Sequence, residues 1–110
     1  MPENSRSAAI AALNDKLRAT PGPGWTVTRG VYALGPDFIA KVVAAVGAFA
    51  RFEPGDDPYG EHDFGAFELA GKRLFWKIDY YNLDLTDAAR DPTNPGQTRR
   101  ILTVMLAEEY

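Results

Sequence analysis

The stretch "HDFGAFELAGKRLFWKIDYYN", residues 62–82, decides the fold, because it carries the strongest strand pattern in the chain. Aromatic and β-branched residues, which favour strands, stand on both sides of a short turn at Ala70-Gly71. Two such runs around a glycine-containing turn predict a β-hairpin. The rest of the chain must then supply strands and helices that cover this hairpin.

The register of the hairpin has two solutions. A two-residue turn would place Gly65 opposite Trp76, whereas a three-residue turn ending in a bulge at Gly71 would place Phe64 there. Because alanine disfavours positive φ, Ala70 makes the bulged turn the expected one. The choice matters, since a slip of one residue moves every side chain of a strand to the other face of the sheet.

The segments before the hairpin carry helix and strand patterns of their own. Apolar residues at helical spacing predict a first helix over residues 5–19. Residues 25–29 alternate as a strand, and Pro36 marks the first turn of a second helix. Residues 49–62 contain prolines and glycines that interrupt regular structure, so they are predicted to form a loop.

The last segment is predicted to be a helix from about residue 95 to the end. Asn94 would cap this helix and Pro95 would occupy its first position. Its apolar stripe contains Ile101, Leu102, Met105 and Leu106. We expect this stripe to pack against the hairpin, with Leu102, Met105 and Leu106 facing Leu74, Trp76 and Ile78.

Charged residues at the two ends of this predicted helix oppose its dipole. Arg99 and Arg100 lie near its N-terminus, and Glu108 and Glu109 lie near its C-terminus. These side chains are therefore expected to pair with other parts of the domain or to face a partner. Tyr110 follows the apolar stripe directly, so we expect it to be packed. The candidate partners of the arginines within the chain are Asp84, Asp87, Asp91 and the acidic loop.

The predicted order is helix, strand, helix, strand, strand, helix. Helices that are segregated to one face of an antiparallel sheet define the α+β class. We therefore predict a single α+β domain over residues 1–110. Its small antiparallel sheet would contain the hairpin and one or two further strands, packed against about three helices.

Composition narrows the functional classes. The net charge of −3 argues against a nucleic-acid-binding surface, which is usually basic. The absence of cysteine excludes disulfides, thiol catalysis and cysteine-ligated zinc, and it makes a cytosolic location the simple expectation. No apolar run approaches the roughly 20 residues that span a bilayer, so no membrane association is expected.

Several separated motifs resemble one family. The motifs are "ALNDKLR" (12–18), "LGPDFIAKVVAAVGAF" (34–49), "DPYGEHDFGAFE" (57–68), "GKRLFWKIDYY" (71–81) and "TRRILTVMLAEEY" (98–110). In this order they resemble domain-of-unknown-function family 3768, small alphaproteobacterial proteins that are often encoded on plasmids. The resemblance implies accessory work on mobile elements, such as plasmid maintenance or counter-defence. It implies no catalytic or binding role for any residue.

The segment "DPYGEHDFG", residues 57–65, contains the only histidine of the chain, His62. One histidine without cysteine cannot build the usual zinc site. An oxygen-rich site for Mg²⁺ or Ca²⁺ was the remaining metal alternative, but the spacing does not match an EF-hand. We expect no metal and no cofactor. The carboxylates considered for such a site are Asp56, Asp57, Glu61 and Asp63.

An enzymatic role and a purely structural role are both compatible with His62 in this segment. A small enzyme would use His62, a residue type that exchanges protons near neutral pH, with Glu61, Asp63 or Asp79. Such an enzyme needs these groups to converge on a concave pocket. The structural alternative has His62 hydrogen-bonded within its own loop or to Asp79 on the facing strand.

The preferred prediction is a protein-binding module with an acidic contact region. Between Arg51 and Lys72 there is no basic Lys or Arg residue, so this segment is uniformly negative and suits a basic protein partner. Nucleic acid is not the expected partner. The predicted contact residues are Asp56, Asp57, Tyr59, Glu61, His62, Asp63, Arg99 and Arg100.

Overall fold

The computed structural model describes residues 2–110, with side chains described from Ser5 onward. Four strands form a single sheet, and the helices precede the hairpin in the sequence. The elements are α1 (Pro2–Arg18), β1 (Trp25–Val27), α2 (Arg29–Tyr32), α3 (Pro36–Gly47), β2 (Phe64–Leu69), β3 (Lys72–Tyr81), β4 (Arg99–Leu106) and the 3-10 helix η1 (Ala107–Glu109).

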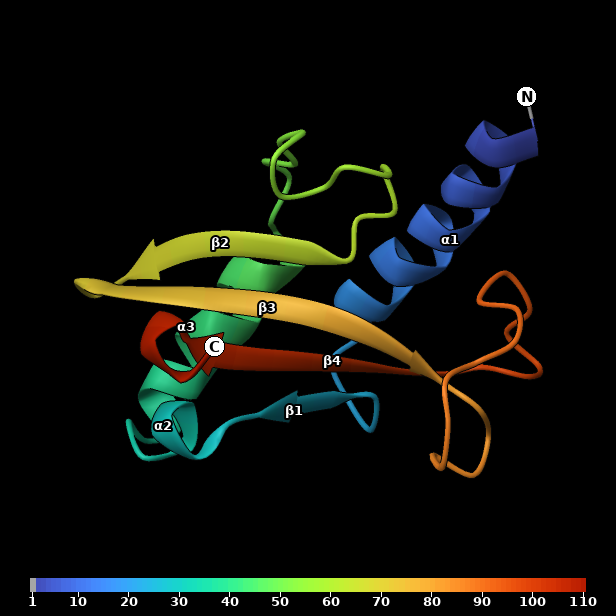
Figure 1. Ribbon diagram of the computed structural model, residues 1–110. Coiled ribbons are helices and arrows are strands. Elements are labelled where there is room, and N and C mark those ends of the chain that lie inside the picture. The colour runs from blue at the N-terminus through green and yellow to red at the C-terminus, as the bar shows by residue number, and fades with distance from the viewer. Residues whose placement is uncertain (1) are drawn as a thin grey trace.

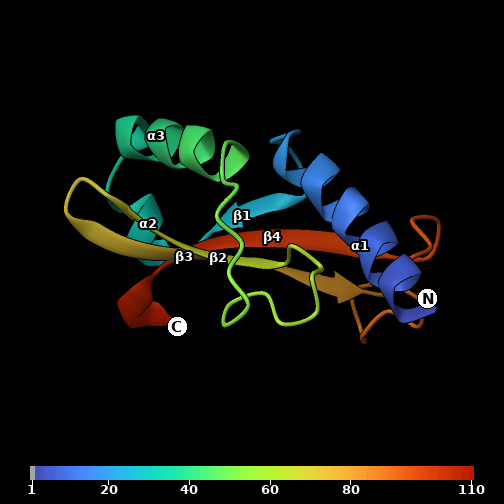
Figure 2. The same cartoon turned by 90° about the horizontal axis from the view of Figure 1, so that it is seen from above.

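The sheet has the order β1-β4-β3-β2, with β1 parallel to β4 and the other neighbours antiparallel. Figure 1 shows β3 and β4 crossing the middle of the molecule, and Figure 2 shows α1 and α3 together over one face of the sheet. The C-terminal end lies on the other face, which we call the open face (Figure 2). The predicted α+β class, with helices on one face of a mostly antiparallel sheet, is confirmed.

The elements before the hairpin agree closely with the sequence prediction. The first helix begins at Pro2 rather than at residue 5 and ends at Arg18. The second long helix begins at Pro36, as predicted. The first strand ends at Val27, two residues early, because the short helix α2 already begins at Arg29. Among the described residues, no helix is both long and apolar enough to cross a membrane.

The predicted bulge in the hairpin is wrong. The turn contains two residues, and Gly65 lies opposite Trp76. Both turn residues have positive φ, 53° at Ala70 and 79° at Gly71. When both turn residues have positive φ, the twist of the turn matches the right-handed twist of the paired strands. The uninterrupted pairing of six residues on each side therefore outweighs the strain at Ala70.

The predicted final helix is also wrong, because residues 99–106 form strand β4. This strand lies between β1 and β3 and pairs with both. Asn94 does not cap a helix; its side-chain Oδ1 accepts a hydrogen bond from the Gly96 N–H at 2.9 Å and shapes a turn. Its buried residues are Leu102 and Val104 on the core face and Met105 on the open face, so the apolar residues do not show the strict alternation of a half-buried strand.

The core lies between the sheet and the helices. The register places Leu74, Trp76 and Ile78 of β3 on the same face as Leu102 and Val104 of β4. The expected contact between the hairpin and the last segment therefore exists, but as neighbouring strands. Met105 is an exception, since it pairs with Phe75 and belongs to the open face. Val31 of α2 and Val42 and Val46 of α3 complete the buried cluster.

Candidate functional site

A groove of about 400 Å³ lies where the loop before β2 meets the C-terminal end of the chain. We call it the acidic groove. It combines exposed aromatic rings with two carboxylates that come from the predicted contact region. Its lining residues are Gly55, Asp56, Pro58, Tyr59, Asp63, Phe64 and Tyr110.

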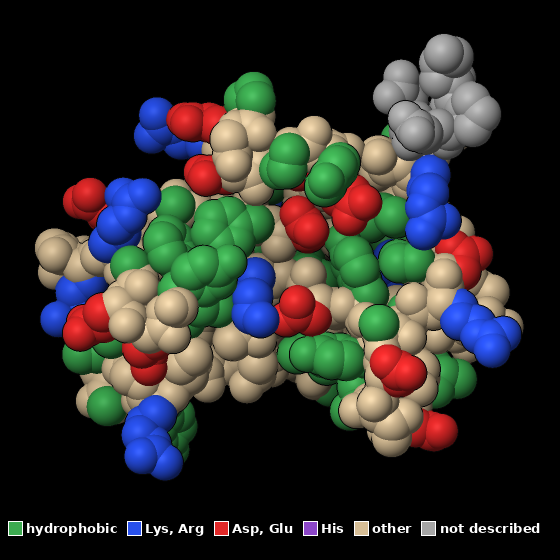
Figure 3. Space-filling model, in the orientation of Figure 1, with side chains coloured by type: hydrophobic (Ala, Val, Ile, Leu, Met, Phe, Trp, Pro, Cys, Tyr) green, Lys and Arg blue, Asp and Glu red, His purple; other side chains and the backbone are tan. Residues whose placement is uncertain are grey.

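Aromatic rings form one wall of the acidic groove. The rings of Phe64, Phe75 and Tyr110 contact one another, with centroid distances between 5.2 and 6.0 Å. Tyr59 and Tyr110 nevertheless expose 77% and 76% of their surface. Figure 3 shows a cluster of hydrophobic side chains on one face of the molecule, with both basic and acidic side chains beside it. The expectation that Tyr110 is packed is therefore wrong, because one face of its ring remains open to solvent.

Glu109 fixes the end of the chain that carries Tyr110. Its Oε1 accepts hydrogen bonds from Thr28 Oγ1 at 2.5 Å and from the Leu106 N–H at 2.8 Å. Its Oε2 accepts a hydrogen bond from the Gly30 N–H at 3.0 Å. These bonds stabilise the ionised carboxylate and lower the pKa of Glu109. Glu109 therefore pairs within the domain, as expected, but with backbone and hydroxyl groups rather than with a cation.

Asp63 is the unusual carboxylate of the acidic groove. Its side chain is half-buried, and burial together with the negative charge of Glu61 raises the pKa of Asp63 to about 6. Within the described part of the chain, neither Asp63 nor Asp56 has a basic nitrogen within 4 Å. The acidic groove therefore holds negative charge that the protein itself does not neutralise.

Asp57 shapes the loop rather than facing a partner. Its side chain is buried, and its Oδ1 accepts a hydrogen bond from the His62 N–H at 3.1 Å. Its own N–H donates to the Glu53 carbonyl at 2.8 Å. Gly60 and His62 both have positive φ, which lets the chain reverse tightly between these bonds. The loop thus has a fixed shape, and Asp57 is not available at its surface.

His62 points toward the helix layer. Its Nδ1 lies 2.9 Å from Asp15 Oδ1 on α1, and its ring stacks on Phe52 with centroids 3.9 Å apart. The expected contact with Asp79 is wrong, because Asp79 pairs with Lys77 at 2.8 Å on the open face. The predicted acid–base group of Glu61, His62 and Asp79 is therefore not brought together. His62 lines neither the acidic groove nor the hollows beside Phe49, Arg51 and Asn82.

Glu61 and Arg100 belong to a buried hydrogen-bond network centred on Asn14 of α1. Asn14 Nδ2 donates to the Glu61 carbonyl at 3.0 Å and to the Tyr80 hydroxyl at 2.8 Å. Asn14 Oδ1 accepts a hydrogen bond from Arg100 Nε at 3.0 Å, and the Tyr80 hydroxyl donates to Glu61 Oε1 at 3.0 Å. Burial raises the pKa of Tyr80 and lowers the pKa of Arg100. This network fastens α1 to the sheet.

Arg99 and Arg100 were expected to pair within the domain, with Asp84, Asp87, Asp91 or the acidic loop as candidate partners, or to face a partner protein. In addition to its bond with Asn14, Arg100 donates a hydrogen bond to the Pro92 carbonyl, and its guanidinium stands over the ring of Tyr80. The exposed Arg99 lies at the start of β4, opposite Tyr81 and at the other end of the strand from Leu106. Neither arginine lines the acidic groove.

Sequence analysis missed the role of Asn14, although a signal was present. Asn14 is four residues after Ile10 and three before Leu17, so it lies on the apolar face of the first helix. It is fully buried. A polar residue in that position requires partners.

Within the described residues there is no group of three or more His, Cys, Asp or Glu side chains that could hold a metal ion.

Comparison with known proteins gives a family without an assigned activity. The family described as "Protein of unknown function (DUF3768)" matches residues 27–109. No curated protein and no solved structure matches the chain.

Proposed function

Because the chain belongs to the DUF3768 family, whose function is unknown, we propose a function from its surface: it is a protein-binding module. Its acidic groove would take a basic side chain, Lys or Arg, from a partner protein. The observation that supports this proposal is that Tyr59, Phe64 and Tyr110 line the same groove as Asp56 and Asp63. Aromatic faces and carboxylates are the two groups that attract a cation.

The two parts of the acidic groove would act on different parts of the bound side chain. The methylene stem of a lysine or arginine would lie against the exposed rings of Tyr59 and Tyr110. Its charged end would reach Asp63, whose half-buried carboxylate forms no ion pair among the described residues. Cation–π contacts at such sites contribute about 0.5–2 kcal/mol each. Asp56, which is exposed, would mainly accelerate association through its charge.

The acidic surface also suggests a biological setting. A basic groove that normally binds nucleic acid is one protein surface with the required charge. The family resemblance adds an accessory role on mobile elements, in plasmid maintenance or counter-defence. In this proposal the module acts in the cytosol and competes for the basic surface of a host protein.

A small enzyme remains the second candidate, and one contact favours it. His62 Nδ1 lies 2.9 Å from Asp15 Oδ1, which is the distance of an oriented histidine–carboxylate pair. The side chains of both residues are partly exposed. Asp15 would then replace Glu61 and Asp79 as the carboxylate that acts with His62.

Nuclear magnetic resonance with a short basic peptide tests the binding proposal. The probe is acetyl-Gly-Lys-Gly-Arg-Gly-amide, titrated into the ¹⁵N-labelled protein at low salt. We expect the amide signals of Tyr59, Asp63 and Tyr110 to shift, with weaker binding at pH 5 than at pH 7.5. The pH effect follows because Asp63, with a pKa of about 6, is mostly neutral at pH 5.

One double variant and one control separate the acidic groove from general charge attraction. Asp63→Asn combined with Tyr59→Ala should weaken binding of the peptide about tenfold. Asp37→Asn removes an exposed charge on α3, far from the groove lining, and should leave binding unchanged. Equal loss in both proteins would contradict the proposal, since it would mean that net charge alone attracts the peptide.

A further inference from the structure

Strand β2 is a free edge of the sheet. It pairs with β3 only, and the Ile78 N–H donates to the Asp63 carbonyl at 2.9 Å. In antiparallel pairing, backbone groups alternate between facing the neighbouring strand and facing away from it. Asp63 and every second residue after it therefore face β3. Ala66 and Glu68 direct their N–H and C=O groups outward, where an additional strand would pair.

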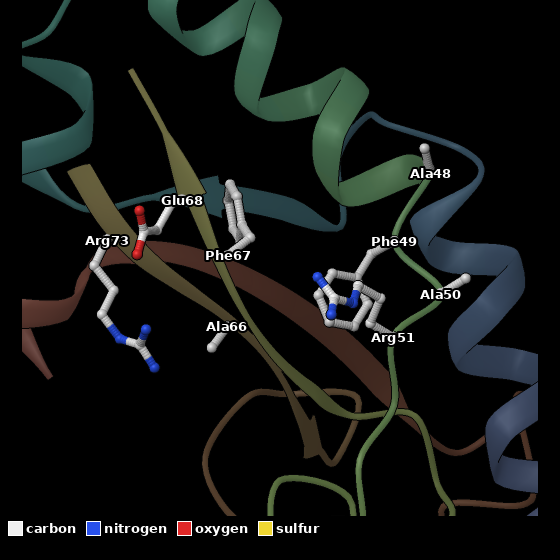
Figure 4. Close-up of a pocket in the computed structure, with 8 residues that line it drawn as sticks. All are labelled: Ala48, Phe49, Ala50, Arg51, Ala66, Phe67, Glu68 and Arg73. Carbon is white, nitrogen blue, oxygen red and sulfur yellow. The ribbon is translucent and has the colours of Figure 1, made fainter. Parts of the chain in front are cut away.

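A hollow of about 590 Å³ runs along this edge. Residues 48–51, which follow α3, and residues 66–68 of β2 line it together with Arg73 (Figure 4). A second hollow of about 200 Å³ shares Arg51, Ala66 and Arg73 with the first and is lined in addition by Glu53 and Asp56. The free backbone at Ala66 is thus accessible from both hollows. The side chains of Phe49 and Phe67 give the larger hollow an apolar wall (Figure 4).

Two arginines reach this edge without an acidic partner. Arg51 and Arg73 are exposed, and no carboxylate in the described part of the chain lies within 4 Å of either guanidinium. Glu68 lies directly across from Arg73 in the strand pairing. Figure 4 nevertheless shows the Arg73 guanidinium extending away from the Glu68 carboxylate. The Arg73 guanidinium also stands over the ring of Phe75, 5.7 Å from its centroid. Neither arginine forms an ion pair among the described residues, so both can bind an external anion.

From these three observations we infer that the β2 edge binds an extended acidic segment of a partner protein as an added strand. Backbone hydrogen bonds would form at Ala66 and Glu68, and carboxylates of the segment would bind Arg51 and Arg73. Main-chain pairing gives such binding its affinity, and alternating side chains give it specificity. This site adjoins the acidic groove, because Asp56 lines both that groove and the smaller hollow. It has the opposite charge preference and uses the backbone of β2, so it does not depend on the proposed function.

Charge decides between this occupant and a second copy of the same chain. Two β2 edges in antiparallel pairing around Ala66 would bring Arg51 and Arg73 of both copies to one interface. Like charges in such an interface disfavour association. A segment that carries glutamates at alternate positions would neutralise both arginines instead.

The test uses the peptide acetyl-Thr-Glu-Val-Glu-Val-Thr-amide and the intact protein. We expect binding to shift the amide signals of Ala66 and Glu68 and to slow hydrogen exchange at both. The peptide in which lysine replaces each glutamate should bind at least tenfold more weakly. The acidic peptide with N-methylated valines should also lose binding, because it cannot complete the backbone pairing.

Variants of the protein test the same arginine and backbone contacts. Arg51→Gln with Arg73→Gln should weaken binding of the acidic peptide at least tenfold, whereas the control Lys41→Gln, an exposed cation on α3, should not. Ala66→Pro removes the outward N–H at a position where an edge strand tolerates proline, and should abolish binding. If this variant does not fold, the N-methylated peptide still tests the backbone pairing.

Three results would overturn the inference. The first is equal binding of the acidic and lysine peptides. The second is unchanged binding after replacement of both arginines. The third is a dimer of the free protein, seen by light scattering, with protection of the Ala66 and Glu68 amides that depends on protein concentration. This result would assign the edge to a second copy.

Discussion

At the scale of single residues, Gly65 shows how tightly the core is built. A Cβ atom at this position would lie 2.6 Å from Phe49 Cζ and would also collide with the indole nitrogen of Trp76. The indole is fully buried, and edge-on rings of Phe49 and Phe52 surround it. Glycine is therefore required here by close packing and not by backbone conformation.

We predict that Gly65→Ala lowers the free energy of unfolding by about 1–3 kcal/mol, because overpacking displaces Trp76 or Phe49. Chemical denaturation measures this change. Gly55→Ala is the matched control, since nothing lies within 4 Å of a Cβ at that position and its φ is not positive. It should change stability by less than about 0.5 kcal/mol. Similar values for the two variants would show that the contact around Gly65 is loose.

Asp63 should make stability depend on pH. Its pKa of about 6 in the folded protein exceeds 3.8, so the folded state binds this proton more tightly than the unfolded state. Stability therefore falls as the pH rises from about 4 to 6. A fully buried carboxylate with this pKa would destabilise the fold by roughly 3 kcal/mol, and solvent screening of this half-exposed one reduces that to about 1 kcal/mol.

We therefore predict that Asp63→Asn raises the free energy of unfolding by about 1 kcal/mol at pH 7.5. The gain should shrink as the pH falls through 6 and disappear below 3.8. Urea titrations at several pH values measure it, with the exposed Asp56→Asn as the control at less than about 0.5 kcal/mol throughout. A gain that is independent of pH would exclude the ionisation of Asp63 as its cause.

At the scale of elements, the last segment shows where sequence reasoning failed. The apolar residues of this segment fit one face of a helix, but they also fit a strand that carries apolar side chains on both faces. These residues are Ile101, Leu102, Met105 and Leu106. Arg99 and Arg100 would lie near the N-terminus of the predicted helix and would oppose its dipole, whereas a strand has no such dipole. Their position therefore argued against a helix. The β-branched Thr103 and Val104 pointed the same way.

The hairpin turn offers a simple test of local strain. Ala70 has φ 53°, a conformation that asparagine adopts more readily than alanine. We predict that Ala70→Asn raises the free energy of unfolding by about 0.5–1 kcal/mol, measured by thermal or urea unfolding. Gly71→Ala, at φ 79°, should lower it by about 1 kcal/mol. A stabilising effect of both substitutions would contradict the two-residue turn.

At the scale of the whole molecule, the Asn14 network joins parts that are far apart in the sequence. Its partners are Glu61, Tyr80 and Arg100, which lie on the loop, β3 and β4. The sequence predicted the α+β class because that depends on local patterns. It could not predict this network or the acidic groove, because both depend on how distant segments come together. Tyr110, for example, lines the groove and is mostly exposed, although the sequence analysis expected it to be packed.

We predict that Asn14→Ala lowers the free energy of unfolding by about 2–3 kcal/mol, because it leaves the buried groups of Tyr80 and Arg100 without this partner. Chemical denaturation checks this value. Lys16→Ala, an exposed position on the same helix, should change stability by less than about 0.5 kcal/mol. A loss that is no larger than in the control would mean that α1 is held by its apolar contacts alone.

The strand order has a consequence for the time course of synthesis. The strand between β1 and β3 is β4, which the ribosome makes after all three of the others. While translation proceeds, β2 and β3 can pair as a hairpin, but β1 has no neighbour. The edge of β3 that β4 will occupy then stays unpaired until β4 emerges. The complete sheet can form only after β4 has been made, and until then the chain exposes strand edges to other nascent chains or to chaperones.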